Sequence, residues 1–292
     1  MLDAVNGKVC RPAHALQHLD PRQPSPFQQA TPQLLNSNLK MIEAIGSSLS
    51  SFQESSLSFP LPAAALWLSV GLLLHLLGSL VLLPTSPASV TSSASSKWKW
   101  QSTYLARNAS ALTGIWALTA LYTSPEMRYD LMFGSSSSGE CLLAFSIGVH
   151  LAEAVDMVWH MQLCKLLIHH VFVVLCFIGA LLTGKAVGFG VLTLATEVSM
   201  VFLKTRRINV MTGLDRASKK FQLNARINLA TLATKVVILS WMNYQSFLYF
   251  GILPLAFLLT CNFGLLFVNF WSISIFNQLV VIDLLKKTKR LL

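Results

Sequence analysis

Ionisable side chains lie inside several long apolar stretches of this chain, where charged groups are rare. The densest group recurs every three or four positions in the run from 141 to 161, and it consists of His150, Glu153, Asp156 and His160. At 100° per residue these four fall within an arc of about 120° on one helix face. A carboxylate can orient an imidazole and raise its basicity, so this face could exchange protons near neutral pH.

Later apolar runs supply further polar groups. They are the adjacent pair His169 and His170, then Glu197 and Ser199, and then Lys235. Ionisable groups at membrane depth usually face the interior of a helix bundle, so we expect all of them to share one interior. A histidine beside Asp156 or Glu197 in a dry cavity could activate an alcohol or amine for acyl transfer, or accept the acyl group itself. The alternative is that the same groups pair across helices and only fix the packing.

Metal and nucleotide chemistry find little support in the sequence. Di-iron membrane desaturases carry closely spaced histidine boxes, whereas this chain has seven histidines, of which His14 and His18 precede every apolar run. The five cysteines form no CxxC pair, and there is no glycine-rich phosphate-binding motif. We therefore expect no metal site and no bound cofactor.

Composition indicates which elements must position these residues. Of the 292 residues 53% are hydrophobic and only 12% are charged, whereas a soluble domain carries about 25% charged residues. The sequence therefore predicts an all-α integral membrane protein. Despite a net charge of +10, it is not expected to bind nucleic acid, and a disordered chain or a disulfide scaffold is excluded.

Apolar runs long enough to cross a bilayer recur along the chain. We predict about seven transmembrane helices, at 61–83, 103–123, 141–161, 163–183, 186–203, 225–242 and, as one kinked helix, 246–282. Residues 1–59 are polar and are predicted to be a poorly ordered leader or a targeting extension. Residues 60–96 are predicted to hold the first transmembrane helix and a linker. Residues 97–287 form the main transmembrane domain, and 288–292 a short tail.

The basic residues lie mainly in the predicted loops after the first, third and fifth spans and in the tail. They are Lys97, Lys99, Lys165, Lys204, Arg206, Arg207, Arg216, Lys219, Lys220, Lys286, Lys287, Lys289 and Arg290. The loops on the other side carry only Arg128 and Lys185 as basic residues, against Glu126, Asp130 and Glu140. The positive-inside rule then predicts a cytosolic C-terminus.

The order of these polar residues resembles the TLC domain family. The pattern consists of Arg107 and Ser110, Asp156, the pair His169-His170, Glu197 and Ser199, Lys235, and finally Asn269 and Trp271. That family takes in ceramide synthases, translocating-chain-associated membrane proteins and the ceroid-lipofuscinosis cargo receptor of the endoplasmic reticulum. The stretch from His169 to Gly179 looks most similar to the cargo-receptor branch.

The resemblance implies a six-helix barrel over 97–287 with an internal cavity for a lipid or acyl chain. It implies that His169 and His170 act as catalytic residues in acyl transfer, with acyl-CoA as a possible substrate. Asp156 and Glu197 are further catalytic candidates, and the other polar groups expected in the cavity are His150, Glu153, His160, Ser199, Lys235, Asn269 and Trp271. The segment 171–196 departs from the ceramide synthase pattern, because it contains no His, Asp or Glu.

Two functions remain open. The first is a lipid-homeostasis protein that binds or acts on acyl chains of sphingolipids or phospholipids. The second is a non-enzymatic cargo receptor or lipid sensor of the endoplasmic reticulum, with a cargo protein as its partner. The terminal Lys289 and Arg290 approximate a di-lysine retrieval signal, although they could equally anchor the tail to a membrane surface.

Overall fold

The computed structural model describes residues 61–82, 87, 90, 94–160, 165–249, 251 and 253–285. The predicted leader 1–59, most of the linker before residue 94 and the tail after residue 285 lie outside the described residues. Within the described part the secondary structure is helical, without strands. An all-α membrane protein is thereby confirmed.

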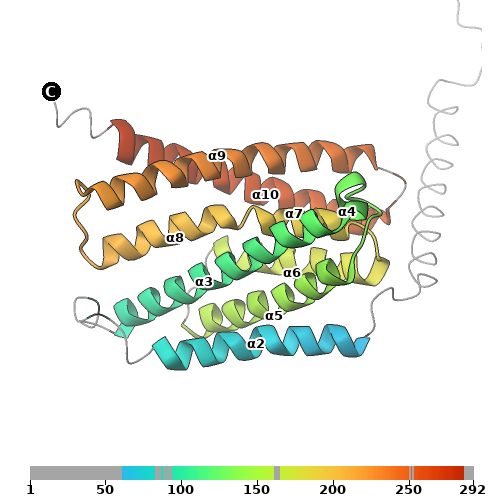
Figure 1. Cartoon of the computed structure of the whole chain (residues 1–292), viewed down its shortest axis with the longest axis horizontal. Helices are drawn as coiled ribbons and strands as arrows, with labels where there is room; N and C mark the ends of the chain where they lie inside the picture. The colour runs from blue at the N-terminus through green and yellow to red at the C-terminus, as the bar shows by residue number, and fades with distance from the viewer. Residues whose placement is uncertain are drawn as a thin grey trace, which may run out of the picture. The chain divides into compact units, whose positions relative to one another are not determined.

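The helices lie side by side as a bundle (Figure 1). Their bounds are α2 Leu61–Leu82, α3 Ala94–Thr123, α4 Pro125–Tyr129, α5 Ser137–Trp159, α6 Lys165–Thr183, α7 Val187–Ala195, α8 Val198–Met211, α9 Lys219–Leu248, α10 Leu255–Leu279 and the π-helical turn η3 Val280–Leu285. Five spans are long and apolar enough to cross a membrane: Leu61–Val81, Ser137–Trp159, Leu166–Thr183, Val187–Met211 and Leu255–Ile282. Helices α3 and α9 cover the other two predicted spans but are more polar, so seven crossings stay a prediction.

The predicted fifth span, 186–203, is not one regular helix. It is divided into α7 and α8 at Thr196 and Glu197, where the backbone changes from four-residue to three-residue hydrogen bonds, such as Glu197 N–H to the Leu194 carbonyl at 3.0 Å. The hydroxyls of Thr196 and Ser199 also donate to backbone carbonyls here, which favours such tightening. The break lies at Glu197 itself.

The last apolar stretch was also predicted incorrectly. Instead of one kinked helix over 246–282, α9 continues to Leu248 and α10 begins after Pro254. Proline has no N–H to donate and suits the start of a helix, so Pro254 separates two helices rather than bending one. The connection turns at Gly251, whose φ of +88° favours glycine. Gly264 lies within α10.

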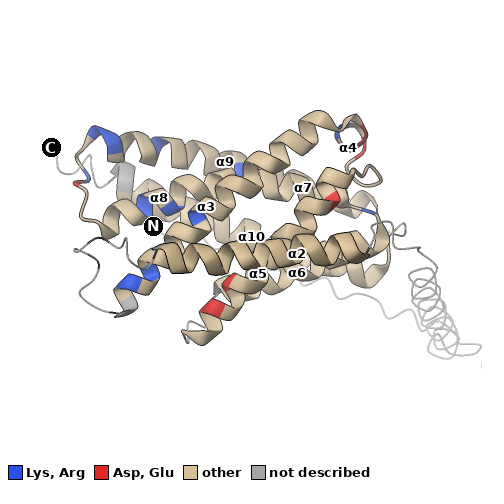
Figure 2. Ribbon diagram, turned by 60° about the horizontal axis from the view of Figure 1, so that its bottom comes forward, with Lys and Arg blue, Asp and Glu red and all other residues tan. Residues whose placement is uncertain are grey.

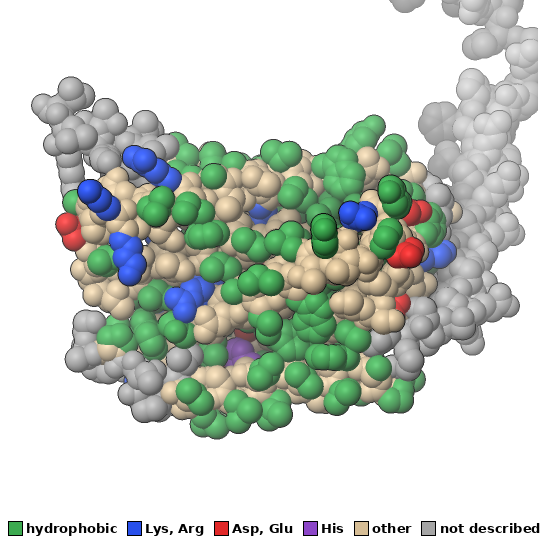
Figure 3. All heavy atoms as spheres, viewed as in Figure 1, with side chains coloured by type: hydrophobic (Ala, Val, Ile, Leu, Met, Phe, Trp, Pro, Cys, Tyr) green, Lys and Arg blue, Asp and Glu red, His purple; other side chains and the backbone are tan. Residues whose placement is uncertain are grey.

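Helix α2 packs on α5 through two glycines. A Cβ on Gly71 would collide with the Phe145 carbonyl, and a Cβ on Gly148 would collide with the Leu68 carbonyl. Small residues allow such close backbone approach in membrane bundles. Large apolar side chains remain exposed on α2 and on other helices, and Figure 3 shows hydrophobic side chains spread over the face it displays.

The basic residues concentrate at one end of the bundle. In Figure 2 most of the coloured Lys and Arg lie where α3 and α9 begin and α8 ends, while the end near α4 carries both signs of charge. This is the distribution expected from the loop sequences. It leaves the middle of the bundle with few charged groups, which are those of the candidate site.

Candidate functional site

A cavity of about 1000 Å³ opens among α3, α5, α6, α8, α9 and α10. Such a volume lies at the upper end of the range of about 300–1,000 Å³ for small-molecule sites. Seven of the predicted site residues line it: His150, Glu153, His169, His170, Glu197, Lys235 and Trp271. The structure therefore gathers groups from five predicted spans at one place.

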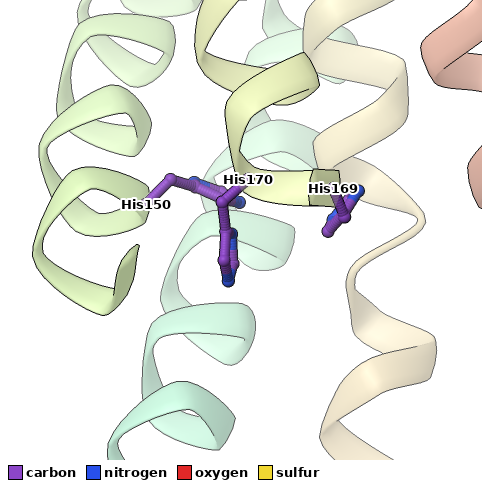
Figure 4. Close-up of side chains that lie close together, drawn as sticks. All are labelled: His150, His169 and His170. Atoms are coloured by element: carbon purple, nitrogen blue, oxygen red, sulfur yellow. The ribbon is translucent and has the colours of Figure 1, made fainter. Parts of the chain in front are cut away.

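Three imidazoles meet on one wall of the cavity. His150 comes from α5, and His169 and His170 come from α6 (Figure 4). The ring centres of His150 and His170 are 5.0 Å apart, and those of His169 and His170 are 5.5 Å apart. One ring nitrogen of each residue lies within 4.8 Å of those of the other two. We call these three residues the histidine group.

The hydrogen bonds of the histidine group are incomplete. Nδ1 of His150 lies 2.7 Å from the backbone carbonyl oxygen of Ser146, so Nδ1 carries the proton and donates it. Nε2 of His170 lies 3.3 Å from a carboxylate oxygen of Glu153, without hydrogen-bond geometry. Nδ1 of His169 and Nδ1 of His170 are buried and have no hydrogen-bond partner among the described residues. These ring nitrogens are therefore available to bind a ligand.

A second group, which we call the Glu197 group, comprises Glu197, Lys235, Ser110 and Lys204. The Lys235 ammonium donates to one Glu197 carboxylate oxygen at 2.9 Å, and the Ser110 hydroxyl donates to the other at 3.3 Å. Lys204 in turn donates to the Ser110 oxygen at 2.9 Å and to the Ala106 carbonyl at 3.0 Å. Each charged side chain here has partners, which is what burial in a bundle requires.

The end of the cavity near the α8–α9 connection is basic. Four arginines line it there: Arg206, Arg207, Arg216 and Arg226. The only acidic side chains among the lining residues are Glu153 and Glu197, and both lie against cationic or imidazole groups deeper inside. We call this end of the cavity the basic mouth. It could bind an anionic group, since Arg suits bidentate contacts with phosphate.

Two predicted members of the polar stripe on α5 do not reach the cavity. Asp156 accepts a hydrogen bond at 2.9 Å from the indole N–H of Trp98 on α3, and His160 stacks on that indole with ring centres 4.4 Å apart. Both are missing from the cavity lining. They lie in the last turn of α5 and its cap, so the stripe continues beyond the cavity and pairs with α3 instead.

Ser199 and Asn269 were also expected in the cavity and lie outside its lining. Ser199 is buried and donates to the Thr196 carbonyl at the α7–α8 break. The Asn269 amide donates to the Ser240 hydroxyl at 2.8 Å, linking α10 to α9. Both side chains therefore support helix geometry in the structure.

A smaller apolar pocket of about 90 Å³ adjoins the histidine group. It shares His169 and Val268 with the main cavity and is otherwise lined mostly by apolar side chains, such as Phe172, Cys176 and Leu265. His169 therefore lines both the larger cavity, which holds the charged groups, and the apolar pocket.

Sequence reasoning missed part of the site. Lys204 was assigned only to a basic loop, and Ser110 only to a family pattern, yet both belong to the Glu197 group. Lys204 follows Glu197 by seven residues, two helical turns, so the spacing alone could have placed it on the same face. The role of Trp98 had no comparable signal, because its partner Asp156 is 58 residues away.

The comparison with protein families agrees with this architecture. The family model of the TLC domain matches residues 99–281. TLC domain-containing protein 2 of Danio rerio is 31% identical over 196 residues, which is 66% of this chain and 79% of that protein. The human protein of the same name is 32% identical over 67% of this chain and 75% of its own length.

TLC domain-containing protein 1 of Gallus gallus is 31% identical over 49% of this chain and 58% of its own length. No solved structure matches the chain significantly. The chain belongs to the TLC domain family, a family of membrane lipid-related proteins. The predicted membership of the TLC domain family is confirmed. The greater similarity to the cargo-receptor branch and the domain boundaries stay predictions.

Proposed function

We propose that this protein acts in lipid homeostasis by binding an acyl chain of a sphingolipid or phospholipid in the cavity and transferring it with the help of the histidine group. The observation that carries the proposal is that one buried and two half-buried imidazoles and a carboxylate line a cavity of about 1000 Å³. The apolar pocket behind His169 offers room for the end of an acyl chain.

The acyl-transfer step uses the groups at the cavity wall. An imidazole of His169 or His170 takes the proton from the amine or hydroxyl group of the acceptor. At the same time the nitrogen or oxygen of the acceptor attacks the acyl carbonyl carbon. The proton then passes to the departing thiolate or alkoxide. The ammonium groups of Lys204 and Lys235 lie in the same cavity and would favour negative charge on the carbonyl oxygen.

The basic mouth supports a substrate that carries phosphate. Acyl-CoA and phospholipids both combine an acyl chain with phosphate groups, and the four arginines face the cavity where such a group would enter. Arg206 also lies over the Phe221 ring, with its guanidinium carbon 5.6 Å from the ring centre. A phosphate-bearing acyl donor thus fits both ends of the site.

The proposed location is the endoplasmic reticulum membrane with a cytosolic C-terminus. The orientation is supported by the concentration of Lys and Arg at the end of the bundle where α8 ends and α9 begins (Figure 2), and the endoplasmic reticulum by the family resemblance. In this orientation the basic mouth opens toward the cytosol, where acyl-CoA is found.

A non-enzymatic lipid sensor or cargo receptor is the second candidate. It is favoured by the Glu197 group, where each ionisable side chain is already paired, and by Asp156, which is hydrogen-bonded to Trp98. Groups held in this way stabilise a bundle without reacting.

Two measurements on the purified full-length protein test the proposal. Mass spectrometry of co-purified lipid should show an enriched acyl species, and its absence would remove the case for an acyl-binding cavity. Labelled acyl-CoA with a sphingoid base or a lysophospholipid should yield product with wild type and not with the double variant His169→Ala, His170→Ala. His160→Ala is the matched control, since His160 lies outside the cavity lining. Bound lipid without turnover would favour the sensor.

A further inference from the structure

The histidine group has the features of a metal site that the sequence did not reveal. We infer that His150, His169 and His170 bind a divalent transition metal of the zinc type, with the Glu153 carboxylate orienting His170. The inference reverses the expectation of no metal, which rested on the spacing of histidines along the chain. His150 lies 19 residues before His169 and joins the pair only through the packing of α5 on α6.

One of the three rings makes the outer hydrogen bond typical of a metal ligand, and a second lies beside a carboxylate. A ligating histidine usually donates its other N–H to a backbone carbonyl or a carboxylate, which fixes the tautomer and aims the lone pair at the metal. Nδ1 of His150 makes such a bond to the Ser146 carbonyl at 2.7 Å, so that in the neutral ring Nε2 is the nitrogen with the free lone pair. Nε2 of His170 lies 3.3 Å from the Glu153 carboxylate without hydrogen-bond geometry, and a small rotation of the ring would complete this hydrogen bond and leave Nδ1 as the ligand atom.

The same rings contain buried nitrogens that lack partners. Nδ1 of His169 and both nitrogens of His170 are buried without a hydrogen bond among the described residues, and His170 is only 3% exposed. Buried polar atoms are normally satisfied, and each exception needs an explanation. A cation bound to the lone pairs of these rings would provide it.

The distances suit zinc after a small adjustment. Tetrahedral zinc with Zn–N bonds of about 2.0–2.1 Å holds its ligand nitrogens roughly 3.4 Å apart. Because the ring nitrogens now lie within 4.8 Å of one another, rotation of the side chains can bring them into range. Three protein ligands leave one position facing the cavity, as in catalytic rather than structural zinc sites.

The two ammonium groups nearest to the site are partly offset by partners of their own. Two ammonium groups face the same cavity, but Lys235 is paired with Glu197 at 2.9 Å and Lys204 is bonded to Ser110 and to a backbone carbonyl. Glu153 contributes a negative charge beside His170. Three neutral imidazoles with one adjacent carboxylate are a donor set that suits zinc and other borderline metals.

This inference does not depend on acyl transfer. A bound metal would polarise an acyl carbonyl as a Lewis acid, and the three histidines would then hold the metal rather than carry the proton. The lipid-binding cavity would stay the same. Loss of metal binding and loss of acyl turnover can therefore be measured separately.

The test uses the tag-free full-length protein in detergent, because a polyhistidine tag would bind metal itself. After equilibration with Zn²⁺ and removal of free ion, elemental mass spectrometry should find one zinc per wild-type chain. His150→Ala and His170→Ala should lose it, whereas the control His160→Ala should keep it. A metal-free wild type, zinc retained in His150→Ala, or equal loss in the control would overturn the inference.

Two further measurements cover the case in which an alanine variant does not fold. Glu153→Gln should weaken zinc binding by about 10–100-fold, the usual effect of removing an outer-shell partner. Zinc should also raise the Tm of wild type, because it binds the folded state, but not that of the conservative variant His150→Gln. An unchanged affinity in Glu153→Gln would contradict the role given to Glu153, and a Tm insensitive to zinc in wild type would contradict the site itself.

Discussion

The Glu197 group and the histidine group lie in one cavity, yet their contacts differ in kind. In the Glu197 group both carboxylate oxygens accept a hydrogen bond, and the two lysines donate to defined acceptors. In the histidine group three buried ring nitrogens have no hydrogen-bond partner within the described part of the chain. A satisfied cluster stabilises a fold, whereas an unsatisfied one is available to a ligand or a reaction. We therefore assign structure mainly to the first group and chemistry to the second.

The largest effect on this comparison should come from Glu197→Leu. It would leave the buried Lys235 ammonium without its carboxylate, and breaking a buried pair in this way costs about 3–5 kcal/mol. We expect a strongly reduced Tm in detergent. The double variant Glu197→Leu, Lys235→Met removes both charges and should recover most of the loss. No recovery would mean that the pair does more than balance charge.

An intermediate effect is expected outside the cavity, at the pair Asp156 and Trp98. Trp98→Phe removes the indole N–H that donates to Asp156 and should cost about 1.5–3 kcal/mol, the value for hydrogen bonds to charged groups. Equilibrium unfolding would measure it. Acyl turnover per folded molecule should not change. A loss of turnover would indicate that Asp156 takes part in the reaction.

The smallest effect on stability is expected in the histidine group. His169→Gln keeps a polar side chain of similar size and breaks no hydrogen bond of Nδ1, so the free energy of unfolding should fall by less than about 1 kcal/mol. Turnover and metal content should nevertheless drop. If stability instead fell as far as in Glu197→Leu, the contrast between the two groups would be lost.

The polar residues show how much of the candidate site could be predicted from the sequence. The predictions that His150, Glu153, His169, His170, Glu197, Lys235 and Trp271 share one interior agree with the cavity lining. Asp156 and His160 lie on the same arc of α5 but contact Trp98 instead of the cavity. The angular spacing of residues on a helix predicts which side they face, but it does not predict which residues of the neighbouring helices lie at the same level. The break before Glu197 was missed since it rests on local hydroxyl contacts within an unbroken apolar run.

The sequence by itself determined the membrane character, the all-helical class, the family and the side on which positive charge collects. These depend on composition, local periodicity and residue order, which are properties of single segments. Only the tertiary structure decided which polar groups meet. The rotation and depth of each helix follow from packing, such as the approach of α2 to α5 at Gly71 and Gly148, and these brought His150 to the pair on α6. Packing of this kind joins residues that no spacing along the chain connects.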